Sequence, residues 1–158
     1  MTIRLYKADD HQACLGIFDS NTPPFFDFAE RNFLENWLNK KDQNEMCYPN
    51  NKVESFFVVE FKEKVIACGG YYIPTHQQCA NMVWGMVHKD SHRKGLGKAL
   101  ILFRINEITS QHPNHNITLD TSQHTFRFFE QLGFKTVKRI ENAYGEGLHR
   151  YDMILENN

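Results

Sequence analysis

A strand that runs into a glycine-rich loop and then directly into a helix constrains this chain more than any other feature. The apolar segment Met82–His88 predicts the strand, and Leu96–Gln111 has apolar residues at helical spacing. Gly95 and Gly97 stand at the junction, where they remove the side chains that would keep a phosphate from the backbone. The first N–H groups of a helix are unpaired, and the helix dipole adds partial positive charge. We therefore predict a pyrophosphate-binding loop here.

Two other kinds of phosphate loop are excluded by spacing. The dinucleotide fingerprint needs a third glycine where this chain has Leu100. The Walker A loop needs glycine and a hydroxyl residue where this chain has His92 and Ala99.

Hydrophobic periodicity along the whole chain predicts a mixed α/β or α+β domain around one sheet. Asp9 or Asp10 can cap a first helix, which ends at Asn21, and Ser122 can cap the last helix. The expected strands are Ile3–Tyr6, Ser55–Phe61, Val65–Tyr72, Ala80–His88, Ile117–Asp120, Phe134–Ile140 and Leu148–Leu155. The later helices are expected at Asp27–Lys40, Leu96–Gln111 and Ser122–Leu132, with a turn at Asn142–Gly147.

The composition excludes several classes of protein. The chain has 158 residues, enough for one domain, and a net charge of −1, which offers no field for nucleic acid or an anionic membrane. No apolar run reaches the ~20 residues of a membrane span, and Met1–His11 is too polar for a leader. We expect a cytoplasmic protein with reduced thiols and with neither nucleic-acid nor membrane partners.

The histidines form no metal-binding pattern. His88 and His92 are four residues apart, and His112 and His115 are three apart, but all four fall at a strand end or in loops. No third ligand accompanies either pair, so we expect no metal.

Two motifs resemble those of the GNAT acetyltransferases. The loop that begins at His92 and ends at Gly97 is similar to the family signature Arg/Gln-x-x-Gly-x-Gly/Ala. The segment Phe129–Phe134 resembles the aromatic-Glu-x-x-Gly-Phe end of the following helix. The resemblance implies a single N-acetyltransferase domain over residues 1–158, with a mostly antiparallel sheet of about seven strands and about four helices.

The resemblance also implies that the loop binds acetyl-CoA. The residues expected to contact it are Met86, Val87, His88, His92, Arg93, Lys94, Gly95, Leu96, Gly97, Lys98, Ser122 and Phe129.

Three of these positions depart from the family pattern. His92 stands where the family has Arg or Gln, a position that mainly supports the loop. Ser122 stands where Asn is common, and it can still hydrogen-bond the pantetheine arm. Phe129 stands where many relatives have a tyrosine that protonates the departing thiolate, and phenylalanine has no proton to give.

Direct acetyl transfer needs a group that accepts a proton from the attacking amine. The strand that carries a glutamate in several relatives has no carboxylate here. Asp120 is the nearest acid by topology, Glu30 and Asp27 come next, and Tyr144 could donate or relay a proton. Each also has a structural explanation: Asp120 and Asp27 as helix caps, and Tyr144 as a surface turn residue.

The remaining site residues are expected at the splayed strand end and near the acceptor. A backbone N–H near Val87 or His88 would stabilise the oxyanion. Phe26 either packs in the core or forms an apolar wall of the acceptor pocket, together with Asp27 and Glu30.

The expected function is acetyl transfer from acetyl-CoA to a primary amine through a tetrahedral intermediate. The alternative is a CoA-binding sensor of the same fold with little catalysis, which the missing tyrosine and missing strand carboxylate favour. The acceptor stays open among a small amine, an amino acid, a polyamine and a protein lysine.

Overall fold

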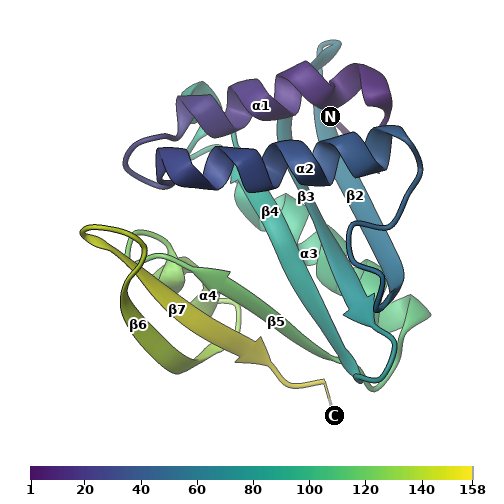
Figure 1. The fold of residues 1–158 in the computed structure, drawn as a ribbon, viewed down its shortest axis with the longest axis vertical. Coiled ribbons are helices and arrows are strands. Elements are labelled where there is room, and N and C mark those ends of the chain that lie inside the picture. Colours follow the sequence, from purple (N-terminus) through teal and green to yellow (C-terminus); the bar gives the residue numbers. More distant parts are fainter. Residues whose placement is uncertain (158) are drawn as a thin grey trace.

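The computed structural model describes residues 1–157 and contains one seven-stranded sheet with the strand order β1-β2-β3-β4-β5-β7-β6 (Figure 1). Within these residues, β4 and β5 run parallel and all other neighbours run antiparallel. The strands are β1 Thr2–Leu5, β2 Asn51–Phe61, β3 Lys64–Pro74, β4 Cys79–Val87, β5 Asn116–Thr121, β6 Lys135–Gly145 and β7 Leu148–Leu155. The α-helices are α1 His11–Ser20, α2 Arg31–Asp42, α3 Leu96–Gln111 and α4 Phe126–Glu130. This architecture confirms the predicted fold class.

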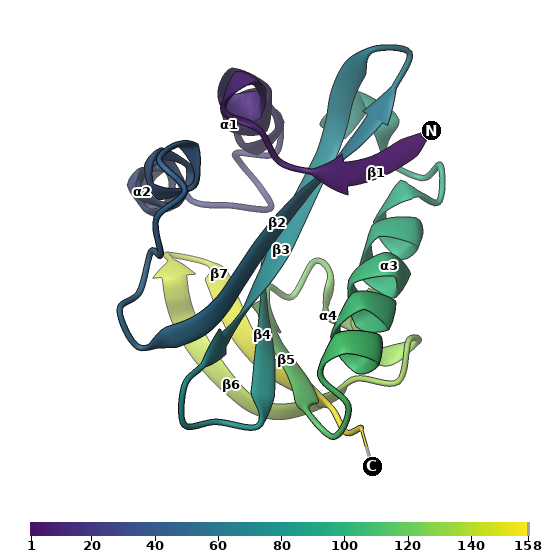
Figure 2. The same cartoon turned by 90° about the vertical axis from the view of Figure 1, so that its right-hand side faces the viewer.

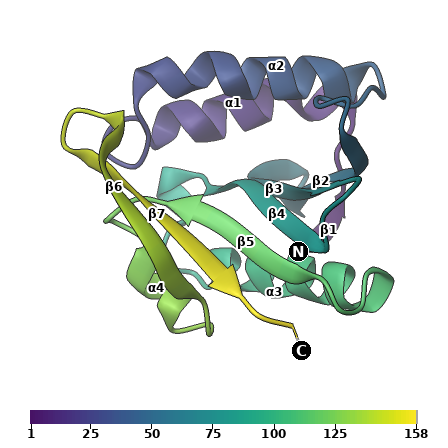
Figure 3. The same ribbon diagram turned by 60° about the horizontal axis from the view of Figure 1, so that its bottom comes forward.

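The helices cover the two faces of the sheet in separate layers. Figures 2 and 3 show α1 and α2 on one face and α3 with α4 on the other. Each layer encloses its own apolar core, because both faces of the central strands are covered. Phe18, Trp37 and Phe56 belong to the core under α1 and α2, whereas Ile101 and Ile117 belong to the core under α3.

A β-bulge in β4 exchanges the two faces of this strand. The pairing of β3 with β4 is interrupted between Cys68 and Gly70, and Trp84 has a left-handed φ of 52°. Met82 packs in the core under α3, whereas Met86 packs in the core under α1 and α2. In a regular strand, the side chains of residues four apart point to the same face of the sheet. The extra residue of the bulge therefore switches the face to which the side chains after it point.

The sheet splits beyond Asn81, just before the bulge. β4 and β5 pair only where Cys79–Asn81 lies opposite Asn116–Thr118, and then they diverge (Figure 1). The later part of β4 therefore has one edge without a neighbouring strand, and this edge faces the functional site.

Several predicted helix starts and caps are wrong. Asp10 precedes α1 but its carboxylate does not cap this helix; it accepts hydrogen bonds from Arg4 Nη1 and the Lys7 N–H, both at 2.8 Å. The second helix begins at Arg31 instead of Asp27, because a 3₁₀ turn, Phe28–Glu30, comes first. Asp27 does cap this turn, since its Oδ1 accepts from the Ala29 N–H at 2.8 Å.

The C-terminal boundaries differ for related reasons. The last helix spans only Phe126–Glu130, and Ser122 is not its cap. The buried Ser122 hydroxyl instead accepts from the His124 N–H at 3.3 Å in the turn that precedes the helix. β6 continues to Gly145, so most of the segment predicted as a turn at Asn142–Gly147 belongs to a strand.

Candidate active site

A cavity of about 720 Å³ occupies the split between β4 and β5. This volume is in the range of small-molecule sites. The glycine loop and the first turns of α3 line one end, and residues of the 3₁₀ turn Phe28–Glu30, β3, β5, β6 and β7 line the other. Among its walls are the predicted site residues Phe26, Glu30, Met86, Val87, His92, Arg93, Gly95, Leu96, Gly97, Lys98, Asp120, Ser122, Phe129 and Tyr144. His88, Lys94 and Asp27 are outside this lining.

The glycine loop leaves a row of backbone donors at the cavity. The Ala99 N–H donates to Gly95 O at 3.0 Å, so the N–H groups of Leu96, Gly97 and Lys98 belong to the unpaired first turn of α3. Gly95 has a φ of 76°, a left-handed conformation that strongly favours glycine. The backbone geometry therefore suits an anion.

His92 braces the end of β4. Its Nε2 lies 2.9 Å from Val87 O, which requires a proton on Nε2, and Asn21 Nδ2 donates to the same oxygen at 2.9 Å. The Phe25 ring packs edge-on against the imidazole. The histidine at this position thus supports the loop through its side chain, as expected for the Arg or Gln that it replaces.

The pairing of β3 with β4 distinguishes the two backbone N–H groups, those of Val87 and His88, that were expected to stabilise the oxyanion. The His88 N–H donates to Ile66 O at 2.8 Å and is therefore not free, so the expectation for His88 is wrong. Val87 lies opposite Ala67 in the adjacent, non-hydrogen-bonded position of the antiparallel ladder. The Val87 N–H consequently points away from β3, toward the split where β4 and β5 diverge.

Two aromatic rings line the cavity from α4. Phe129 packs edge-on against Phe128, with ring centroids 5.1 Å apart, and against the buried Phe134 at 5.9 Å. The Phe26 ring packs 5.0 Å from the Phe18 ring of the core and also lines the cavity, and its role as a wall of the acceptor pocket stays a prediction.

Glu30 is the carboxylate best suited to accept a proton. Its Oε2 accepts from the Asp27 N–H at 2.9 Å, which leaves its other oxygen available. Burial raises the pKa of Glu30 to about 7, and the nearby Asp120 and Asp27 carboxylates add to this increase. A carboxylate with a pKa near neutral pH can act as a general base.

Tyr144 and Asp120 form a hydrogen-bonded pair near Glu30. The Tyr144 hydroxyl donates to Asp120 Oδ2, and Arg150 Nε lies 4.0 Å from the same oxygen. Burial, and then the charge of Asp120, raise the pKa of the Tyr144 phenol well above its ordinary value, so it stays a donor at neutral pH. Tyr144 is therefore not a surface turn residue, because β6 extends far enough to place it at the cavity.

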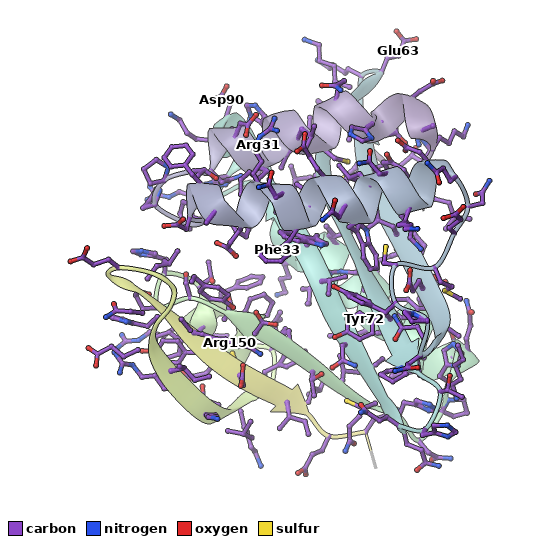
Figure 4. All side chains as sticks on the ribbon, in the orientation of Figure 1. Arg31, Phe33, Glu63, Tyr72, Asp90 and Arg150 are labelled. Carbon is purple, nitrogen blue, oxygen red and sulfur yellow. The ribbon has the colours of Figure 1, made fainter. Side chains whose placement is uncertain are left out.

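Sequence reasoning missed many residues that line the cavity, among them Tyr48, Tyr72, Arg104 and Arg150. Tyr72 and Arg150 extend from β3 and β7 toward the opening between the two halves of the sheet (Figure 4). The Tyr48 ring lies 5.6 Å from that of Tyr72. These residues come from two strands, a loop and a helix that meet only in the folded chain, so no local motif could have revealed them.

The structure gives two further observations about partners. Residues 1–157 contain no group of three potential metal ligands close enough to hold an ion. In the same residues, no helix combines the length and apolarity needed to cross a membrane.

The family model described as the acetyltransferase (GNAT) domain matches residues 21–156. This chain belongs to the GNAT acetyltransferases. A search of curated proteins found no match.

Solved GNAT structures share the fold over nearly their whole length. A protein of Desulfovibrio desulfuricans assigned to the GNAT family has a TM-score of 0.82 at 17% identity, with 99% of each chain covered. The ribosomal-protein-S18-alanine N-acetyltransferase of Escherichia coli has a TM-score of 0.75 at 20% identity, covering 99% of this chain and 94% of that one. The yncA protein of Salmonella typhimurium, solved with acetyl-CoA, has a TM-score of 0.72 at 17% identity, covering 100% and 94%.

Proposed function

We propose that this GNAT protein transfers an acetyl group from acetyl-CoA to a primary amine by direct attack. The supporting observation is that one cavity joins the phosphate loop at Gly95–Lys98 to the carboxylates Glu30 and Asp120. Acetyl-CoA would bind its pyrophosphate at the loop and extend its thioester toward Val87. The E. coli relative is named for acetylation of an alanine, whose amine belongs to the same class of acceptor.

In the proposed reaction the chain moves one proton and stabilises one oxyanion. Glu30 accepts a proton from the ammonium, directly or through water, and so produces the neutral amine. The nitrogen lone pair attacks the thioester carbon, and the Val87 N–H stabilises the oxygen of the tetrahedral intermediate. The C–S bond then breaks, the sulfur leaves with the electron pair, and the nitrogen loses its second proton to solvent.

A screen of amine acceptors, followed by released thiol, tests acetyl transfer. Primary amines should release thiol from acetyl-CoA in the presence of the protein. If acetyl-CoA binds but no amine releases thiol, the protein is the CoA-binding sensor, as the missing hydroxyl at Phe129 would favour.

The pH dependence of kcat/KM tests the base. Because only the ionised carboxylate accepts a proton, kcat/KM should rise with pH through about 7, the pKa given by the burial of Glu30. Glu30→Gln should remove this rise and lower kcat/KM by ~10²–10⁴-fold. Glu35→Gln, an exposed carboxylate on the helix that follows, is the matched control. If Asp120→Asn removes the rise and Glu30→Gln does not, Asp120 is the base.

A further inference from the structure

Arg104 is a buried cation without a counter-ion. It lies on α3 with 4% of its surface exposed, and its Nη1 donates to Gly70 O at 3.1 Å and to Val83 O at 3.5 Å. Its Nε is buried and has no hydrogen-bond partner in residues 1–157. No ion pair within these residues includes it. Proteins retain a buried charge of this kind at a high free-energy cost, so a role for the charge is expected.

Two glycines make room for the guanidinium at the bulge. A Cβ at Gly85 would lie 2.7 Å from Arg104 Nη2, and one at Gly69 would lie 3.0 Å from Cζ. The nearest titratable neighbour is Cys68, whose pKa is raised well above its ordinary value by its hydrogen bond with Cys14 and by burial. Cys68 therefore stays a neutral thiol. Burial lowers the pKa of Arg104 to about 10, which still leaves it charged at neutral pH.

Arg104 is one of the residues that line the cavity, and its guanidinium contacts the carbonyl oxygens of Gly70 and Val83 beside the bulge of β4. Seven residues separate Gly97 from Arg104, which corresponds to about 10 Å along α3. The reactive end of a CoA molecule held at the loop must extend into this part of the cavity. Phe128 and Phe129, which line the cavity from α4, have no proton to donate to a departing sulfur.

We propose that Arg104 supplies the positive charge that stabilises the CoA sulfur as a thiolate when the C–S bond breaks. This inference rests on the proposed acetyl transfer. Glu30 accepts the first proton of the ammonium, the neutral nitrogen bonds to the carbonyl carbon and loses its second proton to solvent, and the sulfur keeps the electron pair of the broken C–S bond. Solvent protonates the thiolate after CoA is released. The same charge favours the thiolate of bound CoA, so the role can be measured without an acceptor.

The experiment titrates the thiol of CoA bound to the protein by the ultraviolet absorbance of the thiolate. S-methyl-CoA, which has no ionisable thiol, gives the baseline and removes the signal of the protein's own cysteines. With the wild-type protein, the pKa of the bound thiol should lie at least one pH unit below the ~8.5 of a free thiol. As pH increases from the bound pKa to the free pKa, the affinity for CoA relative to S-methyl-CoA should then rise about tenfold per pH unit.

Three variants separate the charge from the packing. Arg104→Met keeps the length of the side chain without a charge to bury, so it should fold and return the pKa of the bound thiol to ~8.5 or above. Arg104→Lys should keep a lowered pKa. Arg139→Met, at an arginine on the surface of β6, should behave as wild type. The exposed cations of the loop, Arg93, Lys94 and Lys98, remain in every variant, so their contribution cancels.

The outcomes distinguish this proposal from the proposed function. If the wild-type protein binds CoA with a thiol that titrates at or above ~8.5, the role of Arg104 is refuted without any variant, and the acetyl-transfer proposal stands. An equal lowering in wild type and Arg104→Met also refutes it. If CoA does not bind at all, both proposals fall.

Discussion

Replacement of Gly97 by alanine should separate CoA binding from folding. An alanine Cβ at this position would have Val87 Cγ2 at 3.8 Å and Phe128 Cζ at 4.0 Å as its nearest neighbours, which are ordinary van der Waals contacts. The free protein therefore has space for the methyl group. Because Gly97 lies in the first turn of α3, alanine should raise the free energy of unfolding by about 0.5–1 kcal/mol through its helix propensity.

The same methyl group should oppose CoA. It would occupy the place where a phosphate oxygen meets the backbone N–H groups of the loop. We expect CoA affinity to fall at least 100-fold, which corresponds to about 2.8 kcal/mol of binding free energy. Calorimetry measures the binding, and thermal unfolding should show a midpoint ~2–4 °C higher per kcal/mol gained.

Two further glycines serve as controls for Gly97→Ala. Gly16 lies on the exposed side of α1, where an added Cβ meets nothing within 4 Å, so Gly16→Ala should give a similar stabilisation and unchanged CoA affinity. Gly95 has a left-handed φ of 76°, so Gly95→Ala should instead lower stability by ~1–2 kcal/mol. If Gly97→Ala binds CoA as tightly as wild type, or if the free variant is less stable, the N–H groups of the glycine loop do not bind the phosphates as proposed.

Three other predictions follow from single contacts. Phe129→Tyr should fold normally, keep CoA affinity within a few-fold and keep or increase turnover, measured by steady-state kinetics; a collapse of activity with normal CoA binding would contradict the placement of this ring. Glu54→Gln should lower the free energy of unfolding by about 3 kcal/mol, because the fully buried carboxylate binds Lys41 Nζ at 2.5 Å. It should also raise the KM for the acceptor, because the same carboxylate accepts from the N–H of Tyr48, a residue of the cavity lining, at 3.1 Å. An unchanged denaturation midpoint would refute this. Burial and the neighbouring His115 lower the pKa of His112, so protonation of this imidazole favours the unfolded chain. The free energy of unfolding should therefore decrease as pH falls below ~6.5, the pKa of histidine in the unfolded chain. Thermal unfolding at several pH values should show a smaller decrease for His112→Gln.

The parts of the site that depend on neighbouring residues could be predicted from the sequence. The loop before α3 follows from the local order of strand, glycines and helix, and α3 ends at Gln111 as predicted. The Asp27 cap likewise depends on residues next to it in the chain. In these segments the chemistry of a few consecutive residues decides the conformation.

The parts that depend on distant strands could not be predicted. Arg104 interrupts the apolar stripe of α3, and its burial depends on the absence of side chains at Gly69 and Gly85 on two other strands. The Tyr144 ring reaches Asp120 only because β7 pairs with β5 on one side and with β6 on the other. The expected length of the last helix was wrong because Ser122 forms a turn and the helix begins only at Phe126.

The short parallel pairing between β4 and β5 is expected to make the two halves of the sheet differ in local stability. Backbone pairing joins the two halves of the sheet only from Cys79 to Asn81, so we expect β5, β6 and β7 to open more readily than β1 to β4, although the core under α3 packs against both halves. A ligand in the split touches both halves and should couple their opening. Hydrogen exchange in the far half of β4, and in β5 beyond Thr118, is therefore expected to slow most when CoA binds. Bound CoA would then supply part of the cohesion that strand pairing provides elsewhere in the sheet.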